Sequence, residues 1–122
     1  MVEVICDTSF LIHIATKRIK NIDNLHMEIG TLDFVVPTVV KNELKKLLKT
    51  PSKKDEISLT LNFIENLKSF NLVGTFADKK LIDFASRNHV IIATLDKKLK
   101  KEIKQQGCSI ISIHNEKIIL EN

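Results

Sequence analysis

Apolar residues follow two patterns along the chain, short continuous runs and longer stretches with helical spacing. The short runs are rich in β-branched residues, which is typical of strands buried on both faces. They predict strands at residues 2–6, 33–36, 71–74, 90–94 and 109–113, with a last edge strand at 117–121. Apolar residues at every third or fourth position predict helices at residues 10–15, 39–48, 55–69, 77–88 and 96–106.

Residues with strong local preferences separate these elements. Asp7, Thr8 and Ser9 all favour the N-cap of a helix, and they directly follow the first predicted strand. The segment at 50–55 contains a proline and a serine and predicts a loop or a tight turn. Short buried strands that alternate with helices predict an α/β sandwich with a parallel sheet, and the length predicts one domain, residues 1–122.

Two of the predicted helices carry a carboxylate on the side that should face the core. With residues spaced about 100° apart around the axis, Glu43 falls inside the apolar stripe of the helix at 39–48. Asp78 lies in the apolar arc of the helix at 77–88, whereas Asp83 points to the solvent side. A charge is costly in an apolar stripe, so both acids need an explanation.

Two further acids, Asp7 and Asp96, stand at the carboxyl ends of predicted strands. In a doubly wound parallel sheet, ligand sites lie beyond these ends, at the point where the winding direction reverses. If the two strands are neighbours at that point, Asp7 and Asp96 face each other. Glu43 and Asp78 then lean in from helices that begin at the same edge of the sheet.

Each acid also has a purely structural explanation. Asp7, Asp78 and Asp96 stand where an aspartate caps a helix and interacts well with the helix dipole. Glu43 lies beyond the first turn, so its alternative is to extend to solvent or to pair with a lysine. The four acids together are more informative, because converging carboxylates raise each other's pKa unless a cation neutralises them.

A divalent metal ion is a cation that suits such a cluster. Ligands that are all oxygen select Mg²⁺ or Mn²⁺ over zinc or copper. Acidic clusters of this kind hold one or two ions that bind a phosphodiester, activate water and stabilise the charge on the leaving oxygen. The pattern therefore predicts metal-dependent phosphodiester hydrolysis.

Four blocks of the sequence, taken in order, resemble PIN-domain nucleases. They are ICDTSFL, VVPTVVKNEL, ADKKLIDFA and IIATLDKKLKKEIKQQGCSIISI, and they span nearly the whole chain. The resemblance implies a three-layer α/β/α sandwich with a central parallel sheet and an acidic metal site that cuts RNA. It assigns catalysis and metal binding to Asp7, Glu43, Asp78 and Asp96. It places hydroxyl groups that orient ligands or bind metal waters at Thr8 and Thr94.

The chain departs from the family pattern at two positions. Lys79 stands where members often have a second acid after the first, and Leu95 stands where they tend to have Asn. The short spacing from Asp78 to Asp96 resembles the archaeal and rRNA-processing PIN endonucleases more than the VapC toxins. The leading hypothesis is an endoribonuclease with a role in rRNA processing. The alternatives are a VapC-type toxin of a toxin-antitoxin pair and an RNA-binding domain that cleaves weakly.

The net charge of +4 comes almost entirely from lysine. Such an excess is compatible with a polyanionic partner such as RNA, but also with simple solubility. Two helices carry lysines that we expect to rim the acidic centre and hold RNA phosphates: Lys41, Lys45, Lys97, Lys98 and Lys101. The alternative is that both faces are only solvated. The chain has no Trp or Tyr and most of its six Phe lie in apolar runs, which argues against base-specific recognition by stacking. Recognition of RNA shape or of a structured RNA fits better, with single-stranded RNA as the alternative.

Other features concern the compartment and the partners. The start of the chain lacks a basic leader, and the apolar runs are too short to span a membrane. Cys6 and Cys108 lie in apolar runs, as buried thiols do in a reducing compartment, so we expect a cytoplasmic protein. Members of the family often form homodimers, and an antitoxin or a ribosome-assembly partner suits the two roles. His13 lies in an apolar helix and is expected to be a satisfied core residue.

Overall fold

The computed structural model describes residues 2–17 and 32–121, and the six strands in these ranges form one sheet. Their order is β3-β2-β1-β4-β5-β6, and neighbouring strands are parallel except for β5 and β6. The strands are β1 Val2–Cys6, β2 Leu32–Pro37, β3 Lys68–Phe70, β4 Ile91–Ala93, β5 Ser109–His114 and β6 Lys117–Glu121. The edge strand predicted at 117–121 is therefore confirmed, and it is antiparallel to β5.

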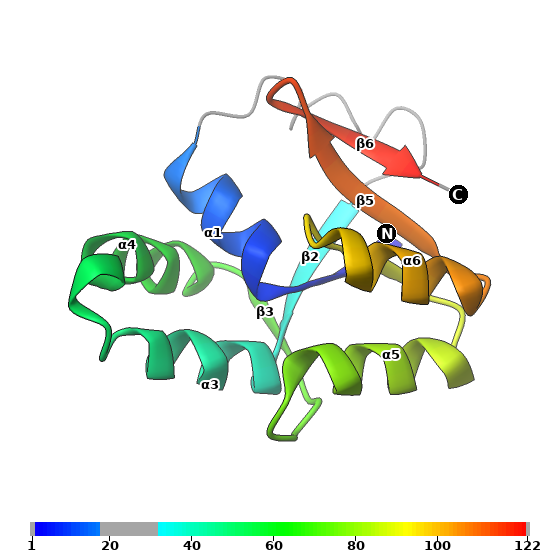
Figure 1. Ribbon diagram of the computed structural model, residues 1–122, viewed down its shortest axis with the longest axis horizontal. Helices are drawn as coiled ribbons and strands as arrows, with labels where there is room; N and C mark the ends of the chain where they lie inside the picture. The colour runs from blue at the N-terminus through cyan, green and yellow to red at the C-terminus, as the bar shows by residue number, and fades with distance from the viewer. Residues whose placement is uncertain (1, 18–31, 122) are drawn as a thin grey trace.

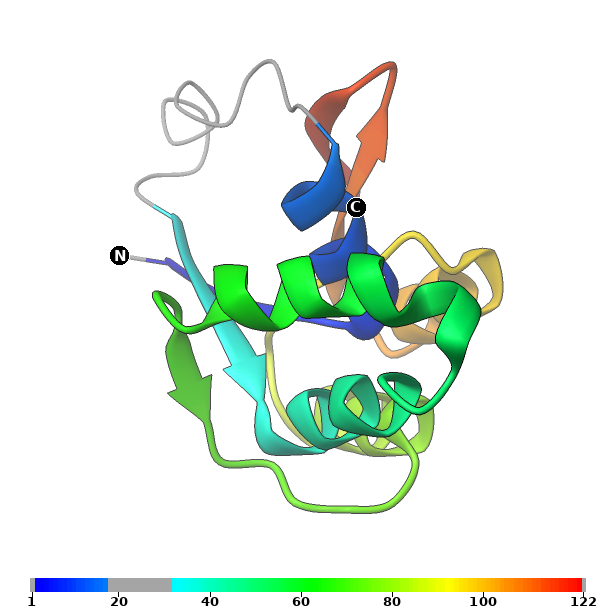
Figure 2. The same cartoon turned by 90° about the vertical axis from the view of Figure 1, so that its left-hand side faces the viewer.

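Helices cover both faces of this sheet (Figures 1 and 2). They are α1 Thr8–Thr16, α3 Thr38–Leu47, α4 Lys54–Ile64, α5 Ala77–Arg87 and α6 Lys97–Gln105, with a 3-10 turn at Pro51–Lys53. Val4 and Cys6 of β1 pack in a cluster with α1, α3 and α4, whereas Ile5 between them packs in a second cluster with α5 and α6. The predicted three-layer α/β/α sandwich is confirmed.

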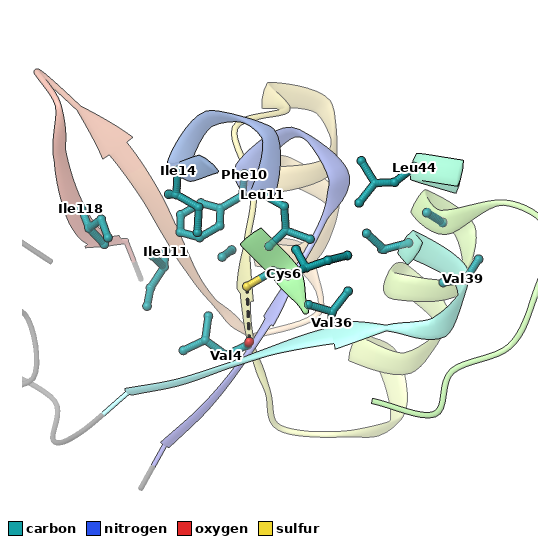
Figure 3. Close-up of a cluster of buried hydrophobic side chains, with 14 of the residues drawn as sticks. Val4, Cys6, Phe10, Leu11, Ile14, Val36, Val39, Leu44, Ile111 and Ile118 are labelled. Carbon is teal, nitrogen blue, oxygen red and sulfur yellow. Dashed lines mark hydrogen bonds between the residues drawn. The ribbon is translucent and has the colours of Figure 1, made fainter. Parts of the chain in front are cut away.

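The first of these clusters fixes the positions of α1 and α3 over the sheet. Phe10 and Leu11 of α1 pack with Cys6 and Val36 of the sheet and with Leu44 of α3 (Figure 3). All five side chains are buried. Because close-packed side chains tolerate little displacement, the residues at the starts of α1 and α3 are held in fixed relation to the strand ends.

The structure corrects one part of the sequence prediction. The helix predicted at 55–69 ends at Ile64, and the following strand is Lys68–Phe70 rather than residues 71–74. This short edge strand is largely exposed, so its pairing with β2 depends on backbone hydrogen bonds that leave no apolar pattern in the sequence. Residues 71–76 form the loop that leads into α5.

The winding of the sheet reverses between β1 and β4. β2 and β3 extend the sheet on one side of β1, and β4 pairs on the other side, with Cys6 opposite Ala93. The two strands that precede Asp7 and Asp96 are therefore neighbours, as expected. In Figure 1, α1, α3, α5 and α6 all begin toward the middle of the molecule, near the ends of these strands. This is the region where the acidic residues collect.

Three smaller expectations can be compared with the described residues. No helix within residues 2–17 and 32–121 is both long enough and apolar enough to cross a membrane. Cys6 and Cys108 are buried free thiols, as the sequence predicts. His13 is partly buried, but its Nε2 atom has no hydrogen-bond partner among the described residues, so it is not the fully satisfied core histidine that was expected.

Candidate active site

Asp7 lies at the end of β1, with its carboxyl group buried against the end of β4. Its side chain accepts hydrogen bonds from the backbone N–H of Phe10, at 3.0 Å, and from the hydroxyl groups of Thr94 and Ser9, at 2.5 Å and 2.9 Å. The bond from Phe10 makes Asp7 the N-cap of α1, so the capping explanation holds for this residue. It is also one of the few buried polar residues, since only 4% of Asp7 is exposed.

Burial changes the acidity of this carboxyl group. Loss of hydration raises the pKa of Asp7 to about 6, although the hydrogen bonds from Thr94, Phe10 and Ser9 oppose the change. Repulsion from Asp78 adds to the increase. Asp7 is therefore less acidic than an ordinary aspartate, and a nearby cation would restore its charged form.

Thr94 and Ser9 join the ends of the two central strands. The Thr94 hydroxyl donates to Asp7 and accepts from the backbone N–H of Asp96, at 3.1 Å. The Ser9 hydroxyl accepts from the backbone N–H of Leu95, also at 3.1 Å. Thr94 was expected beside the site, but Ser9 was not. A hydroxyl two residues after a capping aspartate is the sequence signal that would have indicated it.

Asp96 begins α6 on the other side of this junction. One of its carboxylate oxygens accepts from the backbone N–H groups of Lys98 and Leu99, at 2.9 Å and 3.2 Å, so Asp96 is the N-cap of α6. Its side chain is exposed, and the second oxygen receives no hydrogen bond from the described residues. Capping therefore accounts for one oxygen of this carboxylate and leaves the other without a role.

Glu43 is held inside the apolar margin of α3 by a hydroxyl group. The Thr8 Oγ1 atom donates a 2.7 Å hydrogen bond to Glu43 Oε1, and both residues are half-buried. Glu43 therefore does not pair with a described lysine, and it does not extend freely to solvent. Thr8 and Glu43 lie on α1 and α3, so this bond joins two helices above the strand ends.

Asp78 is the acid whose carboxylate interacts electrostatically with each of the others. It lies in the first turn of α5, but the N-cap is Phe76 and Asp78 does not cap the helix. Loss of hydration raises the pKa of Asp78, and repulsion from Asp96, Glu43 and Glu102 raises it further, while Lys98 opposes the change. Asp78 also repels Asp7, so the structure brings all four predicted acids within electrostatic reach of one carboxylate.

Glu102 is a fifth acid at this site that sequence reasoning missed. It is a half-buried residue of α6 and it repels Asp78. The test that singled out Glu43 would also have found it. Glu102 lies three residues after the buried Leu99 and directly before the buried Ile103, so it stands at the margin of the apolar stripe of α6.

The donor set suits a hard divalent cation. Carboxylate and hydroxyl oxygens are the ligands that Mg²⁺ and Mn²⁺ prefer, and the mutual repulsion of the acids would be relieved by positive charge between them. Glu43 and Asp78 line one hollow of about 330 Å³. In the described ranges, no three His, Cys, Asp or Glu side chains are already grouped to hold an ion. Binding therefore requires side-chain rotation, which is open to the exposed Asp78, whereas Asp96 keeps one oxygen in its cap and has the second one available.

The lysines predicted to form a rim are all exposed: Lys41 and Lys45 lie on α3, and Lys97, Lys98 and Lys101 lie on α6. Lys97 and Lys101 line a hollow with Lys100 and Lys104 that none of the acids lines. Lys98 is near enough to attract the Asp78 carboxylate. Lys100 and Lys104 are different, because they form ion pairs with Glu121 at 3.3 Å and 2.8 Å and hold β6 against α6.

An α/β/α sandwich with acids gathered where the winding of the sheet reverses is the architecture expected of a PIN domain. A family model described as a PIN like domain matches residues 4–116, and the chain belongs to this family. The resemblance to PIN domains that was drawn from the sequence is therefore confirmed.

Individual relatives extend over most of the chain. Ribonuclease VapC4 of Methanocaldococcus jannaschii is 28% identical over 123 residues, which cover 96% of this chain and 94% of that protein. Ribonuclease VapC9 of Archaeoglobus fulgidus is 29% identical over 108 residues, covering 87% of this chain and 78% of that protein. The structure of the PIN domain endonuclease Utp24 matches with a TM-score of 0.77 and 25% identity over 98% of this chain and 90% of that chain.

The metal-free protein should become more stable as the pH falls from 7 toward 4. The folded pKa of Asp7, about 6, lies above its ordinary value of 3.8, so the folded state keeps a proton in this window that the unfolded chain releases. The gain from Asp7 amounts to about 2 kcal/mol near pH 4. Urea unfolding in EDTA at several pH values measures it. The control is Asp7→Asn, which lacks this proton, and a wild type that does not gain stability relative to the variant would contradict the prediction.

Replacing Glu43 should affect metal binding more than folding. Glu43→Ala loses the bond from Thr8, a net cost of about 1 kcal/mol, and relieves repulsion with Asp78, so the metal-free stability should change by no more than about 1 kcal/mol. Calorimetry should show weaker Mn²⁺ binding. Asn42→Ala, on the exposed side of the same helix, should change neither property. A loss well above 2 kcal/mol in EDTA would make Glu43 a structural partner.

Proposed function

We propose that this protein is a metal-dependent endoribonuclease that hydrolyses RNA phosphodiester bonds at the acids Asp7, Glu43, Asp78 and Asp96. The observation that carries the proposal is the electrostatic position of Asp78, which is repelled by Asp7, Glu43, Asp96 and Glu102. Such mutual repulsion is unfavourable for the fold by itself, and it is understandable if the acids serve a bound cation. The PIN-family membership and the ribonuclease and endonuclease relatives support the same activity.

The acids divide into a fixed part and an adjustable part. Asp7 is buried and held by three donor residues, so it would give a rigid ligand at the floor of the site. Glu43 is oriented by Thr8, and Asp96 is held through one oxygen as the N-cap of α6, while Asp78 is exposed and free to rotate toward a substrate. Bound Mg²⁺ or Mn²⁺ would supply charge neutralisation at the phosphodiester and a water of lowered pKa. Thr94 and Ser9 would keep Asp7 oriented throughout, as hydrogen-bonding neighbours of metal ligands do.

RNA would be held by exposed lysines of α3 and α6. We assign this role to the exposed Lys41, Lys45, Lys97, Lys98 and Lys101, which lie on the two helices that flank the site. Contacts of this kind bind phosphate without reading sequence and weaken as salt is added. The attraction between Lys98 and Asp78 supports placing one of these cations at the edge of the acidic group.

Two biological roles are compatible with this chemistry. The likeness to the PIN domain endonuclease Utp24 supports endonuclease activity, and we propose rRNA processing with a ribosome-assembly partner as the first role. The two VapC relatives support a toxin that is bound by an antitoxin. A small protein encoded beside this chain that inhibits its cleavage would decide for the toxin. In either role we treat residues 1–122 as one domain, which the single shared sheet supports. We place the protein in the cytoplasm, which the buried free thiols support. We also expect a homodimer.

A third role, RNA binding with weak cleavage, is suggested by Lys79 and Leu95. Leu95 packs against the core, and its backbone N–H holds Ser9, so an apolar side chain at this position supports the network around Asp7. The Lys79 ammonium lies 5.3 Å from the centre of the Phe76 ring. Neither residue displaces one of the four main acids, so we favour an active enzyme.

Asp78→Asn should reduce Mn²⁺-dependent cleavage of RNA on the order of 100-fold, because it removes one charge from the centre of the acidic group. Its stability should be unchanged or slightly raised in EDTA, since Asp78 is exposed and receives no hydrogen bond from a described residue. Cleavage is measured by gel with a labelled RNA and by the rate at saturating Mn²⁺.

The matched control is Asp55→Asn on α4. Asp55 is exposed and also lies in the first turn of its helix, so its replacement removes an equal charge from a helix that carries none of the five acids of the site. The control should cleave at the wild-type rate. If both variants cleaved RNA at the same rate, the acidic site would not be required for catalysis. Salt-sensitive RNA binding without any cleavage by the wild type would favour the RNA-binding role.

A further inference from the structure

Phe76 is a large apolar side chain left on the surface beside the acids. It is 63% exposed, whereas the five other phenylalanines are buried in the two hydrophobic clusters or packed against them. The sequence expectation that aromatic side chains are not free to stack on bases therefore has one exception. An isolated exposed phenylalanine is not unusual in itself, so its meaning depends on its position.

Helix capping does not account for Phe76. It occupies the N-cap position of α5, and its side chain makes no capping hydrogen bond. Ser, Thr, Asp and Asn are strongly preferred at this position because they satisfy free backbone N–H groups. Thr75, a residue that could cap, lies one position earlier. Phe76 thus serves neither the core nor the start of its helix.

Phe76 lines two hollows. It lines the 330 Å³ hollow together with Glu43 and Asp78, and it lines a second hollow of about 380 Å³ together with Lys80 and Asp83. Lys79 also lines both hollows, and its ammonium lies 5.3 Å from the centre of the Phe76 ring. An aromatic face and a cation therefore stand together at the border of the acidic site.

Lys80 is positioned by the loop that carries Phe76. A Cβ atom at Gly74 would lie 2.4 Å from Lys80 Cε, so the stem of Lys80 lies directly against the glycine backbone. Figures 1 and 2 show this loop between β3 and α5 running along the outside of the molecule, next to α3 and α5. The second hollow thus holds the cation of Lys80 as well as the aromatic ring, while its acid Asp83 is paired with Arg87.

We propose that Phe76 and Lys79 form a subsite for an unpaired nucleobase next to the phosphodiester that is cut, with Lys80 contacting the following phosphate. The proposal rests on the proposed function and names its substrate class as single-stranded RNA. An aromatic ring with an adjacent cation suits a base, because every base has a π-face and stacks without regard to sequence. A paired base is already stacked within its helix and would have to leave it to reach Phe76.

The absence of tryptophan from the chain allows a direct test. Phe76→Trp introduces a single tryptophan at the subsite, and a base stacked on it should quench its fluorescence. The experiment uses the Asp78→Asn background with Mn²⁺, in which a gel confirms that the RNA stays intact. A single-stranded oligonucleotide should quench the signal, and a blunt duplex of the same strand should quench it far less. Leu59→Trp, 56% exposed on α4, is the matched control and should respond to neither.

Affinity separates stacking from simple apolar contact. Phe76→Ala should weaken single-strand binding in the same background between about 5-fold and about 150-fold. Phe76→Leu should lose most of the same affinity, because leucine keeps the apolar surface and lacks the π-face. If Phe76→Leu binds single-stranded RNA like the wild type, the stacking proposal is overturned and an apolar protein partner is the better explanation of the exposed ring.

The base subsite at Phe76 and the nuclease activity can be tested separately. Wild-type cleavage of RNA, together with unquenched Phe76→Trp and normal binding by Phe76→Ala, would overturn the base subsite and leave the nuclease assignment standing. Quenching by single-stranded RNA, without cleavage by the wild type under any metal condition, would support the subsite and overturn the nuclease.

Discussion

The buried carboxyl group of Asp7 is the constraint on which the rest of the site depends. It stands where β1 ends beside β4, and its burial is tolerable only because donors converge on it from α1 and from Thr94. Those donors have to come from both strands and from the first turn of α1. Three features therefore stabilise the one buried carboxyl group of Asp7. They are the reversal of the sheet between β1 and β4, the N-cap of α1, and the hydroxyl groups of Ser9 and Thr94.

The fixed position of Asp7 helps to explain where the other acids lie. Glu43, Asp78 and Glu102 come from three different helices, and each lies at the margin of an apolar stripe, where a side chain can reach either the interior or solvent. The fold thus concentrates negative charge in one place and leaves positive charge on the outer faces of α3 and α6. Such a separation costs stability in the absence of a ligand, which is a frequent property of functional sites.

The sequence allowed most of the fold to be predicted, because buried parallel strands and amphipathic helices leave clear periodic patterns. It did not allow β3 to be placed, since an exposed edge strand is held by backbone pairing with β2 and needs no apolar residues. The four candidate acids could be selected from the sequence because two of them interrupt an apolar face, and the structure brings them within electrostatic reach of one another. Ser9 and the bond from Thr8 to Glu43 were not found, because they depend on which side chains meet across elements far apart in the chain.

The ion pairs of Glu121 affect how salt titrations of this protein should be read. Lys100 and Lys104 fasten the last strand to α6, the same helix that begins at Asp96 and displays Lys97, Lys98 and Lys101. Added salt would screen these pairs as well as any contact between lysine and RNA, although Glu121 and Lys100 are partly sheltered from solvent. The slope of affinity against salt concentration would then include a loosening of the helix itself. Counting released counterions from that slope would overestimate the number of phosphates that the protein touches.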